Sequence, residues 1–201
     1  STTLTNCTFT GNEGVFGGAI ISGGTGTTLT LTNCTITQNR AELFGGGIVL
    51  NPVTVLMKNT ICINNTALSD ANIRGSVSSA SSYNLIGVDG TGGMDGTGGL
   101  INGENNNQVG VSNAYLSSVG SYGGYGQTIA LLPGSPAINA GTAVDAPTTD
   151  QRGTARVGAT DIGAFESRGF TMSYSSGDNQ TTLAKTAFPH PLAVTVASPS
   201  N

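Results

Sequence analysis

The sequence is poor in charge and in the aromatic residues that many binding sites use. Only 7 of its 201 residues are Lys or Arg and 11 are Asp or Glu, so that charged residues make up 9% of the chain, and Trp is absent. Ordinary globular domains carry about 25% charged residues. The net charge of −4 offers no basic surface for a nucleic acid, which excludes that class of partner. No apolar run approaches the ~18 residues of a membrane-spanning helix, so we expect no membrane insertion.

The chain also lacks the residues of a transition-metal site and the periodicity of helices. It has one histidine, His190, and no Cys-x-x-Cys motif, which leaves little to hold such a metal. No stretch shows the 3.6-residue apolar period of an amphipathic helix. Glycine is abundant instead, with 31 residues, and Thr, Ser and Asn are frequent. This composition favours strands and turns, and we predict an all-β protein without a bound cofactor.

A repeat of 26 or 27 residues occupies the first third of the chain. The motif LTNCTFTGN, from Leu4, recurs as LTNCTITQN from Leu31 and as MKNTICINN from Met57. A second motif accompanies it, as FGGAII from Phe16 and FGGGIV from Phe44. Repeats of this length, with Asn and Gly at the corners, are typical of the coils of a parallel β-helix, which is a solenoid.

The repeat predicts which side chains stack inside the solenoid. Side chains alternate along each strand, and coils stacked in register place equivalent residues in files. The predicted interior files are Leu4, Leu31 and Met57; Cys7, Cys34 and Thr60; and Phe9, Ile36 and Cys62. Asn6, Asn33 and Asn59 fall at the bend. We expect an asparagine ladder there, whose amides bond to one another and to corner backbone groups.

The three cysteines Cys7, Cys34 and Cys62 are an odd number, which excludes a fully paired set within the chain. Their places in the interior files predict free, buried thiols. Cys7 and Cys34 would lie one strand spacing apart, about 4.8 Å, so distance alone leaves a disulfide open. Parallel neighbours that point the same way are, however, poorly oriented for one.

Threonines are predicted to face outward in the first two coils. Thr3, Thr5, Thr8 and Thr10 would match, one coil later, Thr30, Thr32, Thr35 and Thr37. Flat Thr files are the surface with which β-solenoid antifreeze proteins meet ice, so ice binding is one alternative. Thr is also common on solvent-facing strands in general.

The third coil breaks these threonine files. Leu56, Ile61 and Ile63 would place apolar side chains on the outside, where the earlier coils are polar. An exposed apolar patch usually marks a contact surface. We therefore expect that the C-terminal tail, or a strand of a neighbouring copy, docks on these three residues.

A duplicated hexad follows the repeat, as DGTGGM and then DGTGGL from Asp89. Asp89 and Asp95, with Glu104 nearby, are the candidate ligands for Ca²⁺. A calcium site needs six or more oxygen ligands, and these carboxylates fall short of that number. A loop without a metal is the competing interpretation.

Seven of the charged residues are concentrated between Asp145 and Arg168, around the stretch DQRGTARVGATDIGAFE. Acids and arginines alternate there, which favours a structural cap whose Arg–carboxylate pairs pin a closing loop over the exposed backbone of the last coil. The residues of this predicted cap are Asp150, Arg152, Arg156, Asp161 and Glu166. Two alternatives remain open, an ion site and a glycosidase-like pair of carboxylates such as Asp150 and Asp161.

The stretch LLPGSPAINAG, followed by TDQRGTARVGATDIGAFE and preceded by NNTA and YNLIG, resembles the choice-of-anchor Q domain family. The resemblance covers about residues 1–167 and implies a right-handed parallel β-helix on or outside a bacterial cell. Asn139 departs from the family's pattern, in which an Asp is expected. From Phe170 the chain resembles the first strands of a bacterial immunoglobulin-like domain. We therefore divide the chain into a β-helix over 1–168 and an extended β tail over 169–201.

These observations predict a non-enzymatic module of a secreted or bacterial cell-surface protein, serving as a scaffold, an adhesin stalk or a filament subunit. The first and last residues read as strands that have been cut, so we expect a piece of a longer protein. We expect it to associate head to tail with itself by strand addition, or with adjacent domains. The competing class is a carbohydrate-active enzyme or a glycan-binding module. Either of these should align carboxylates, aromatic residues and bases along one outer face.

Overall fold

The computed structural model describes residues 1–24, 26–51, 54–88 and 97–198, and divides the chain into two compact units, Ser1–Glu166 and Ser167–Asn201. The first unit is a parallel β-solenoid of about four turns, which confirms the fold class predicted from the repeat. Among the described residues, no helix has the length and apolar character that crossing a bilayer requires.

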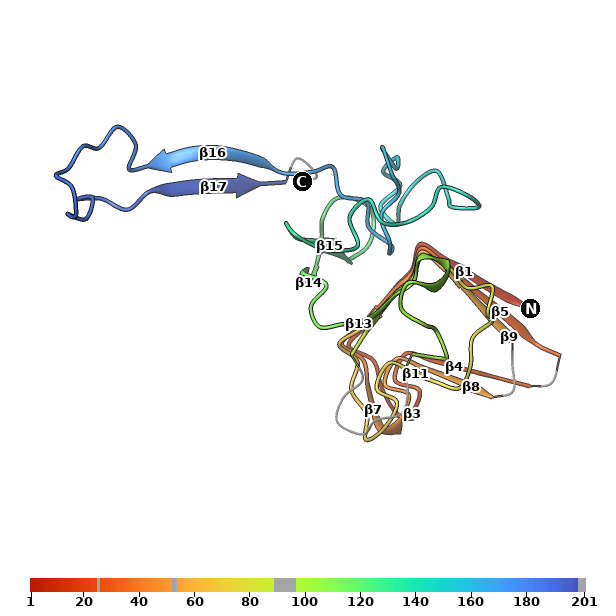
Figure 1. Ribbon diagram of the computed structural model, residues 1–201. Helices are drawn as coiled ribbons and strands as arrows, with labels where there is room; N and C mark the ends of the chain where they lie inside the picture. The colour runs from red at the N-terminus through yellow and green to blue at the C-terminus, as the bar shows by residue number, and fades with distance from the viewer. Residues whose placement is uncertain (25, 52–53, 89–96, 199–201) are drawn as a thin grey trace. The chain divides into compact units, whose positions relative to one another are not determined.

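Three parallel sheets run along the solenoid (Figure 1). The first sheet consists of β1 (Thr2–Thr5), β5 (Thr28–Thr32) and β9 (Thr54–Lys58). The second consists of β2 (Thr8–Thr10), β6 (Thr35–Thr37), β10 (Ile61–Ile63), β12 (Leu85–Gly87) and β13 (Gln108–Val111). The third consists of β4 (Ile20–Gly23), β8 (Ile48–Asn51) and β11 (Ile73–Arg74).

The strand register confirms two of the three predicted interior files. In the first sheet Leu4 pairs with Leu31, and Leu31 with Met57. In the second sheet β2, β6 and β10 align in the same way, and bring Phe9, Ile36 and Cys62 into one file. Most members of these files belong to one hydrophobic core. Burial of each such side chain contributes about 1.5–3 kcal/mol, so stacking of the coils supplies the driving force for folding.

Each of the first three coils turns from the first sheet to the second at an asparagine in the left-handed region. The φ angle is 52° at Asn6, 50° at Asn33 and 50° at Asn59. Asn adopts positive φ more readily than most residues because its short polar side chain can bond locally. The repeated Asn therefore allows the backbone to adopt the bend, and its side chains form a row of carboxamides there.

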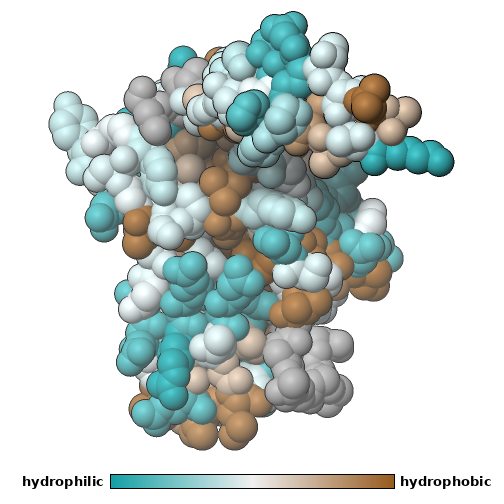
Figure 2. Space-filling model, turned by 90° about the vertical axis from the view of Figure 1, so that its left-hand side faces the viewer, coloured by the Kyte–Doolittle hydropathy of each residue, from teal (hydrophilic) through white to brown (hydrophobic). Residues whose placement is uncertain are grey.

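A corner between the second and third sheets is formed by β3 (Glu13–Phe16) and β7 (Arg40–Phe44). Phe16 stacks on Phe44 with 4.7 Å between ring centroids. The glycines after each Phe are required by close packing, since a Cβ at Gly46 would collide with the carbonyl oxygen of Thr66 in the next coil. Figure 2 shows hydrophobic surface at the lower end of the molecule, at the level of β3 and β7 in Figure 1.

Residues 114–166, here called the closing segment, leave the coils and cover the second sheet. They contain an antiparallel pair, β14 (Leu116–Gly120) and β15 (Thr128–Leu131), and otherwise run as turns and loops. Before them, η1 (Glu104–Asn106) forms a single 3-10 turn. Leu131, Ile162 and Phe165 of the closing segment pack against Ile61 and Ile63 of β10 in a second hydrophobic core.

This second core corrects one prediction. Ile61 and Ile63 do face away from the interior of the solenoid, but the closing segment covers them, where we expected the C-terminal tail or a neighbouring copy. Both side chains are at most 1% exposed. Leu56 lies in the first sheet, is half-buried, and takes no part in this core.

The second unit is an antiparallel hairpin of β16 (Thr171–Ser176) and β17 (Ala193–Ala197). Met172 pairs with Val196, and Tyr174 with Val194, on one face of the ribbon. All four of these side chains are at least half exposed. The hairpin therefore exposes an apolar face, and a two-stranded ribbon is by itself only marginally stable in water.

Candidate functional site

The charged residues of the closing segment form a buried network, and Asp150 organises its first half. Its Oδ1 accepts hydrogen bonds from the backbone N–H of Arg152 (2.8 Å) and of Thr154 (3.1 Å), which closes the turn of the DQRGT stretch. Its Oδ2 accepts from the Nε of Arg152 (2.8 Å) and from the backbone N–H of Glu166 (3.0 Å). A carboxylate with this many donors is held firmly in place, and Asp150 is only 3% exposed.

The Arg152 guanidinium joins three parts of the closing segment. Its Nη2 lies 2.7 Å from Asp150 Oδ2 and 2.7 Å from the carbonyl oxygen of Glu166, and its Nη1 donates to the carbonyl oxygen of Tyr122 (3.1 Å). The guanidinium carbon also lies 3.7 Å from the centroid of the Phe165 ring. This stacked, multiply bonded geometry is one that Lys could not reproduce.

Glu166 organises the second half of the network. Its Oε2 accepts from Arg156 Nη1 (2.8 Å) and from the backbone N–H of Asp161 (3.0 Å), and its Oε1 accepts from the backbone N–H of Val157 (3.1 Å). Glu166 is fully buried. Asp161, also buried, accepts from the backbone N–H of Asn139 (2.6 Å).

Asn139 takes part in this network through its backbone. Its φ of 55° lies in the left-handed region, and its side chain is exposed. Asn and Asp both adopt that region more readily than most residues. The backbone contact therefore needs no carboxylate at this position, where the family pattern would place one.

The bend asparagines fasten this network to the coils. Asn6 Nδ2 donates to the carbonyl oxygen of Thr149 (2.7 Å), and Asn6 Oδ1 accepts from Arg156 Nη2 (3.0 Å). Asn33 Nδ2 lies 3.3 Å from the carbonyl oxygen of Asp161. Asn59 binds Thr142 twice, as donor to its carbonyl oxygen (2.8 Å) and as acceptor from its N–H (2.9 Å).

These contacts correct the predicted place of the cap. We expected it over the open end of the last coil, but it lies along the flank of several coils, against the bends at Asn6, Asn33 and Asn59. The ladder is also only partly as predicted. Asn59 donates to Asn33 (3.2 Å), whereas the amide of Asn6 bonds to Thr149 and does not reach Asn33. The carboxamides bind the closing segment because its backbone offers the corner groups their missing partners.

A second asparagine ladder was missed in the sequence. Asn12 Nδ2 donates to Asn39 Oδ1 (2.8 Å), Asn39 Nδ2 to Asn65 Oδ1 (2.9 Å), and Asn65 Nδ2 to Asn72 Oδ1 (3.2 Å). Asn39, Asn65 and Asn72 are at most 5% exposed. Each copy of the repeat ends in Asn at the same place, so the spacing could have predicted this ladder. The prediction considered only the asparagines at the bend.

The closing segment also covers the threonines of the second sheet. The Thr8 hydroxyl lies 3.1 Å from that of Thr128, and the Thr35 hydroxyl accepts from the backbone N–H of Ala164 (3.0 Å). Thr35 and Thr37 are at most 2% exposed. This file is therefore not available as a flat surface for ice.

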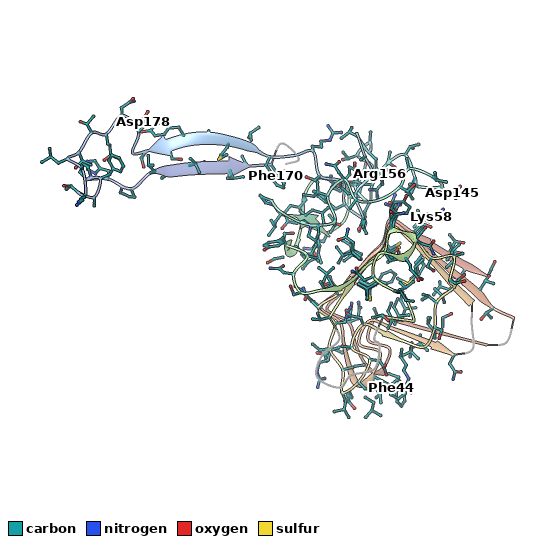
Figure 3. All side chains as sticks on the ribbon, viewed as in Figure 1. Phe44, Lys58, Asp145, Arg156, Phe170 and Asp178 are labelled. Carbon is teal, nitrogen blue, oxygen red and sulfur yellow. The ribbon has the colours of Figure 1, made fainter. Side chains whose placement is uncertain are left out.

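The predicted match of Thr3 with Thr30 and of Thr5 with Thr32 is confirmed, and Lys58 in the third coil has a role that we did not foresee. Thr30 pairs with Leu56 and Thr32 with Lys58 in the first sheet. Lys58 forms an ion pair with Asp145, at 2.8 Å (Figure 3). The carboxylate is 78% exposed, so this pair contributes little to stability.

All three cysteines are free, as predicted, and two of them interact. A hydrogen bond with Cys34 lowers the pKa of the Cys7 thiol to about 6. The same hydrogen bond, together with burial, raises the pKa of Cys34, and burial alone raises that of Cys62. Cys7 is half-buried while Cys34 and Cys62 are buried.

The candidate calcium ligands Asp89 and Asp95 lie outside the described residues. Within the described ranges, no group of three or more His, Cys, Asp or Glu side chains is arranged to hold a metal ion. Glu104, the third candidate, is exposed in η1.

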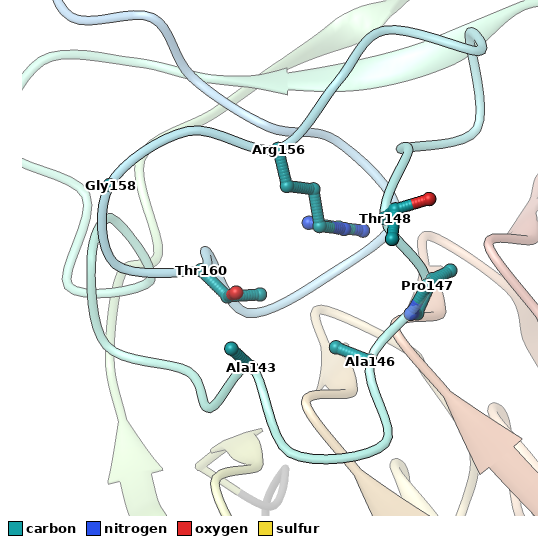
Figure 4. A pocket seen from close by; sticks show the side chains of 7 residues that line it. All are labelled: Ala143, Ala146, Pro147, Thr148, Arg156, Gly158 and Thr160. Atoms are coloured by element: carbon teal, nitrogen blue, oxygen red, sulfur yellow. The ribbon is translucent and has the colours of Figure 1, made fainter.

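A hollow of about 200 Å³ lies beside the charged network. It is lined by Ala143, Ala146, Pro147, Thr148, Arg156, Gly158 and Thr160. The Arg156 side chain reaches across it (Figure 4).

The sequence matches no protein-family model, and neither a curated protein nor a solved structure shows significant similarity to the chain. The resemblance to the choice-of-anchor Q domain family therefore stays a prediction, while the β-solenoid fold rests on the strand pairing itself.

Proposed function

We propose that this chain is a non-enzymatic structural module of a secreted or bacterial cell-surface protein. The proposal rests on how the carboxylates of the charged cluster are bonded. Asp150 and Glu166 are buried, and their carboxylate oxygens accept hydrogen bonds from backbone N–H groups and guanidinium groups. A general acid or base must instead reach the proton that it transfers. The cluster is therefore arranged as a fastening of the closing segment.

The composition and the sequence resemblance support the extracellular location. A chain with 9% charged residues and abundant Thr, Asn and Gly is typical of elongated surface modules, in which stacked backbone ladders and small polar side chains supply most of the contacts. A scaffold, an adhesin stalk or a filament subunit would each use the solenoid as a rigid spacer.

Head-to-tail association is the second part of the proposal. Within the described residues, β1, β2, β3 and β4 each pair with another strand on one side only. Leu4, Phe9 and Ile20 of this first coil are only partly buried, whereas their file partners Leu31, Ile36 and Ile48 are 0% exposed. Unpaired strand edges above a partly open core favour the addition of further strands. We propose that a second copy of the chain, or an adjacent domain of a larger surface protein, supplies these strands.

Sedimentation velocity and negative-stain microscopy test this assembly. The wild type should form concentration-dependent oligomers or fibres. Thr3→Pro should weaken them, since Pro blunts an exposed strand edge, while the matched control Thr3→Val should associate like the wild type. A wild type that stays monomeric at high concentration would refute the association, as would a folded Thr3→Pro variant that assembles normally.

A panel of polysaccharide substrates tests the non-enzymatic part separately. No hydrolysis or elimination is expected. An activity that Asp150→Asn removes while circular dichroism shows a folded protein would overturn the structural interpretation of the cluster and favour the carbohydrate-active class.

A further inference from the structure

The hollow beside Arg156 has the features of a small binding site. Its volume is about 200 Å³, and liquid water takes about 30 Å³ per molecule, so it holds several waters or one small ring. Two stretches of the closing segment, 143–148 and 156–160, bound it. Ala143, Ala146 and Pro147 give it apolar patches, and Arg156 and Thr160 give it polar ones (Figure 4).

Arg156 contributes a donor that the protein leaves unused. Its Nη1 donates to Glu166 Oε2 (2.8 Å), and its Nη2 donates to Asn6 Oδ1 (3.0 Å) and to the carbonyl oxygen of Gly163 (3.1 Å). Its Nε has no hydrogen-bond partner within the described residues, although only 5% of the side chain is exposed. A buried donor without an acceptor is unfavourable. Because the Nε atom is itself closed off from solvent, the Arg156 side chain must shift toward the hollow before an oxygen there can accept this hydrogen bond.

The charge around Arg156 favours an uncharged ligand. The guanidinium is already paired with the Glu166 carboxylate at 2.8 Å, and Arg152 is paired with Asp150 at 2.7 Å. Asp161 adds a third buried carboxylate to the same network. Three carboxylates against two guanidinium groups leave no positive charge to attract an anion, so an acceptor oxygen without charge fits better.

We propose that the hollow binds one neutral sugar ring of a glycan. A hydroxyl oxygen of the ring accepts the hydrogen bond from Arg156 Nε, and the C–H groups of the ring pack on Ala143, Ala146 and Pro147. A sugar ring carries hydroxyl groups beside C–H groups, and the lining of the hollow likewise places polar side chains beside apolar ones. A peptide would offer a carbonyl oxygen, but its side chain would need a deeper apolar pocket than small Ala and Pro groups provide.

Nuclear magnetic resonance of the ¹⁵N-labelled full chain tests this proposal, because the Arg156 Nε–H group gives its own signal. Arg156→Lys assigns that signal by its loss, and keeps a cation beside Glu166. The probes are methyl β-D-galactopyranoside, methyl α-D-glucopyranoside and N-acetyl-D-glucosamine, added to about 100 mM because a single-ring contact gives Kd values in the millimolar range. Sodium D-glucuronate and N-acetyl-alanine amide serve as the charged and the peptide-like comparisons.

At least one neutral sugar should shift the Nε–H signal saturably, together with backbone signals of 143–148 and 156–160. Ala143→Phe, a change at an exposed residue that fills the hollow, should abolish the shift and leave the other signals in place. The proposal is overturned if no neutral sugar shifts the Nε–H signal. It is equally overturned if glucuronate or the alanine amide binds more tightly than every neutral sugar. Either result would leave the structural role of the solenoid unaffected.

Discussion

At the scale of single residues, the two kinds of asparagine in each repeat have different tasks. Asn33 and Asn59 adopt positive φ at the bend and bind the closing segment. Asn39 and Asn65 turn inward and bond to each other along the axis of the solenoid. Both kinds are buried with their hydrogen bonds made, which avoids the cost of an unpaired amide, about 1–3 kcal/mol each.

The buried ion pairs of the closing segment are the residues on which stability should depend most. Glu166→Gln removes the charge that faces Arg156 and leaves a guanidinium uncompensated in a buried site. Breaking a buried pair in this way costs about 3–5 kcal/mol. The control is Asp145→Asn, which removes the exposed pair with Lys58 and should cost less than about 1 kcal/mol. Urea denaturation measures both, and equal losses would contradict the assignment.

The thiol pair predicts a pH dependence. The pKa of Cys7 is about 6 in the folded protein, below its ordinary value of 9.0. Ionisation of Cys7 therefore stabilises the fold fully above about pH 9, and this contribution is lost as the pH falls through about 6. Because the thiolate is the nucleophile, the rate of alkylation of Cys7 by iodoacetamide should rise with a midpoint near pH 6. Cys34→Ala removes the hydrogen-bond partner and should move the midpoint toward 9; an unchanged midpoint would show that Cys34 has no such effect.

At the scale of elements, the coils could be predicted from the sequence and the closing segment could not. The repeat sets both the strand positions and the interior files, because equivalent residues must stack in register. The closing segment has no repeat, and apart from β14 and β15 it is held by side-chain bonds between residues far apart in the chain, such as Asn59 and Thr142. Its charges could be recognised as a structural cluster, but nothing in their spacing indicates which face of the solenoid they cover.

The apolar residues that interrupt the threonine files did predict a covered surface. The closing segment covers it, and this contact can be tested by mutation. Ile63→Asp places a carboxylate in the core between β10 and the closing segment. An unpaired charge there should cost at least ~3 kcal/mol and detach the segment. Ile21→Asp is the matched control, because Ile21 is 63% exposed and surface changes usually stay within about 0.5 kcal/mol. Thermal unfolding of the two variants compares them; similar losses would argue that the second core has no special role.

At the scale of the whole molecule, two cores share one sheet. The interior core fills the coils, and the second core lies between the outer face of the second sheet and the closing segment. A sheet with both faces buried explains why β10 reads as an uninterrupted apolar run, Ile61–Ile63, where a half-exposed strand would alternate. The charged network lies at the margin of this second core and joins it to the bends.

The central claim is that this network fastens the closing segment to the solenoid. Native-state hydrogen exchange of the wild type and of Glu166→Gln tests it most directly, because it resolves local opening residue by residue. Amides that bond the segment to the coils, those of Gly163 and Ala164, should lose protection in the variant. The coil-to-coil amides of Ile61 and Leu85 should keep theirs. Equal loss at both sets of amides, or no loss at Gly163 and Ala164, would contradict the claim.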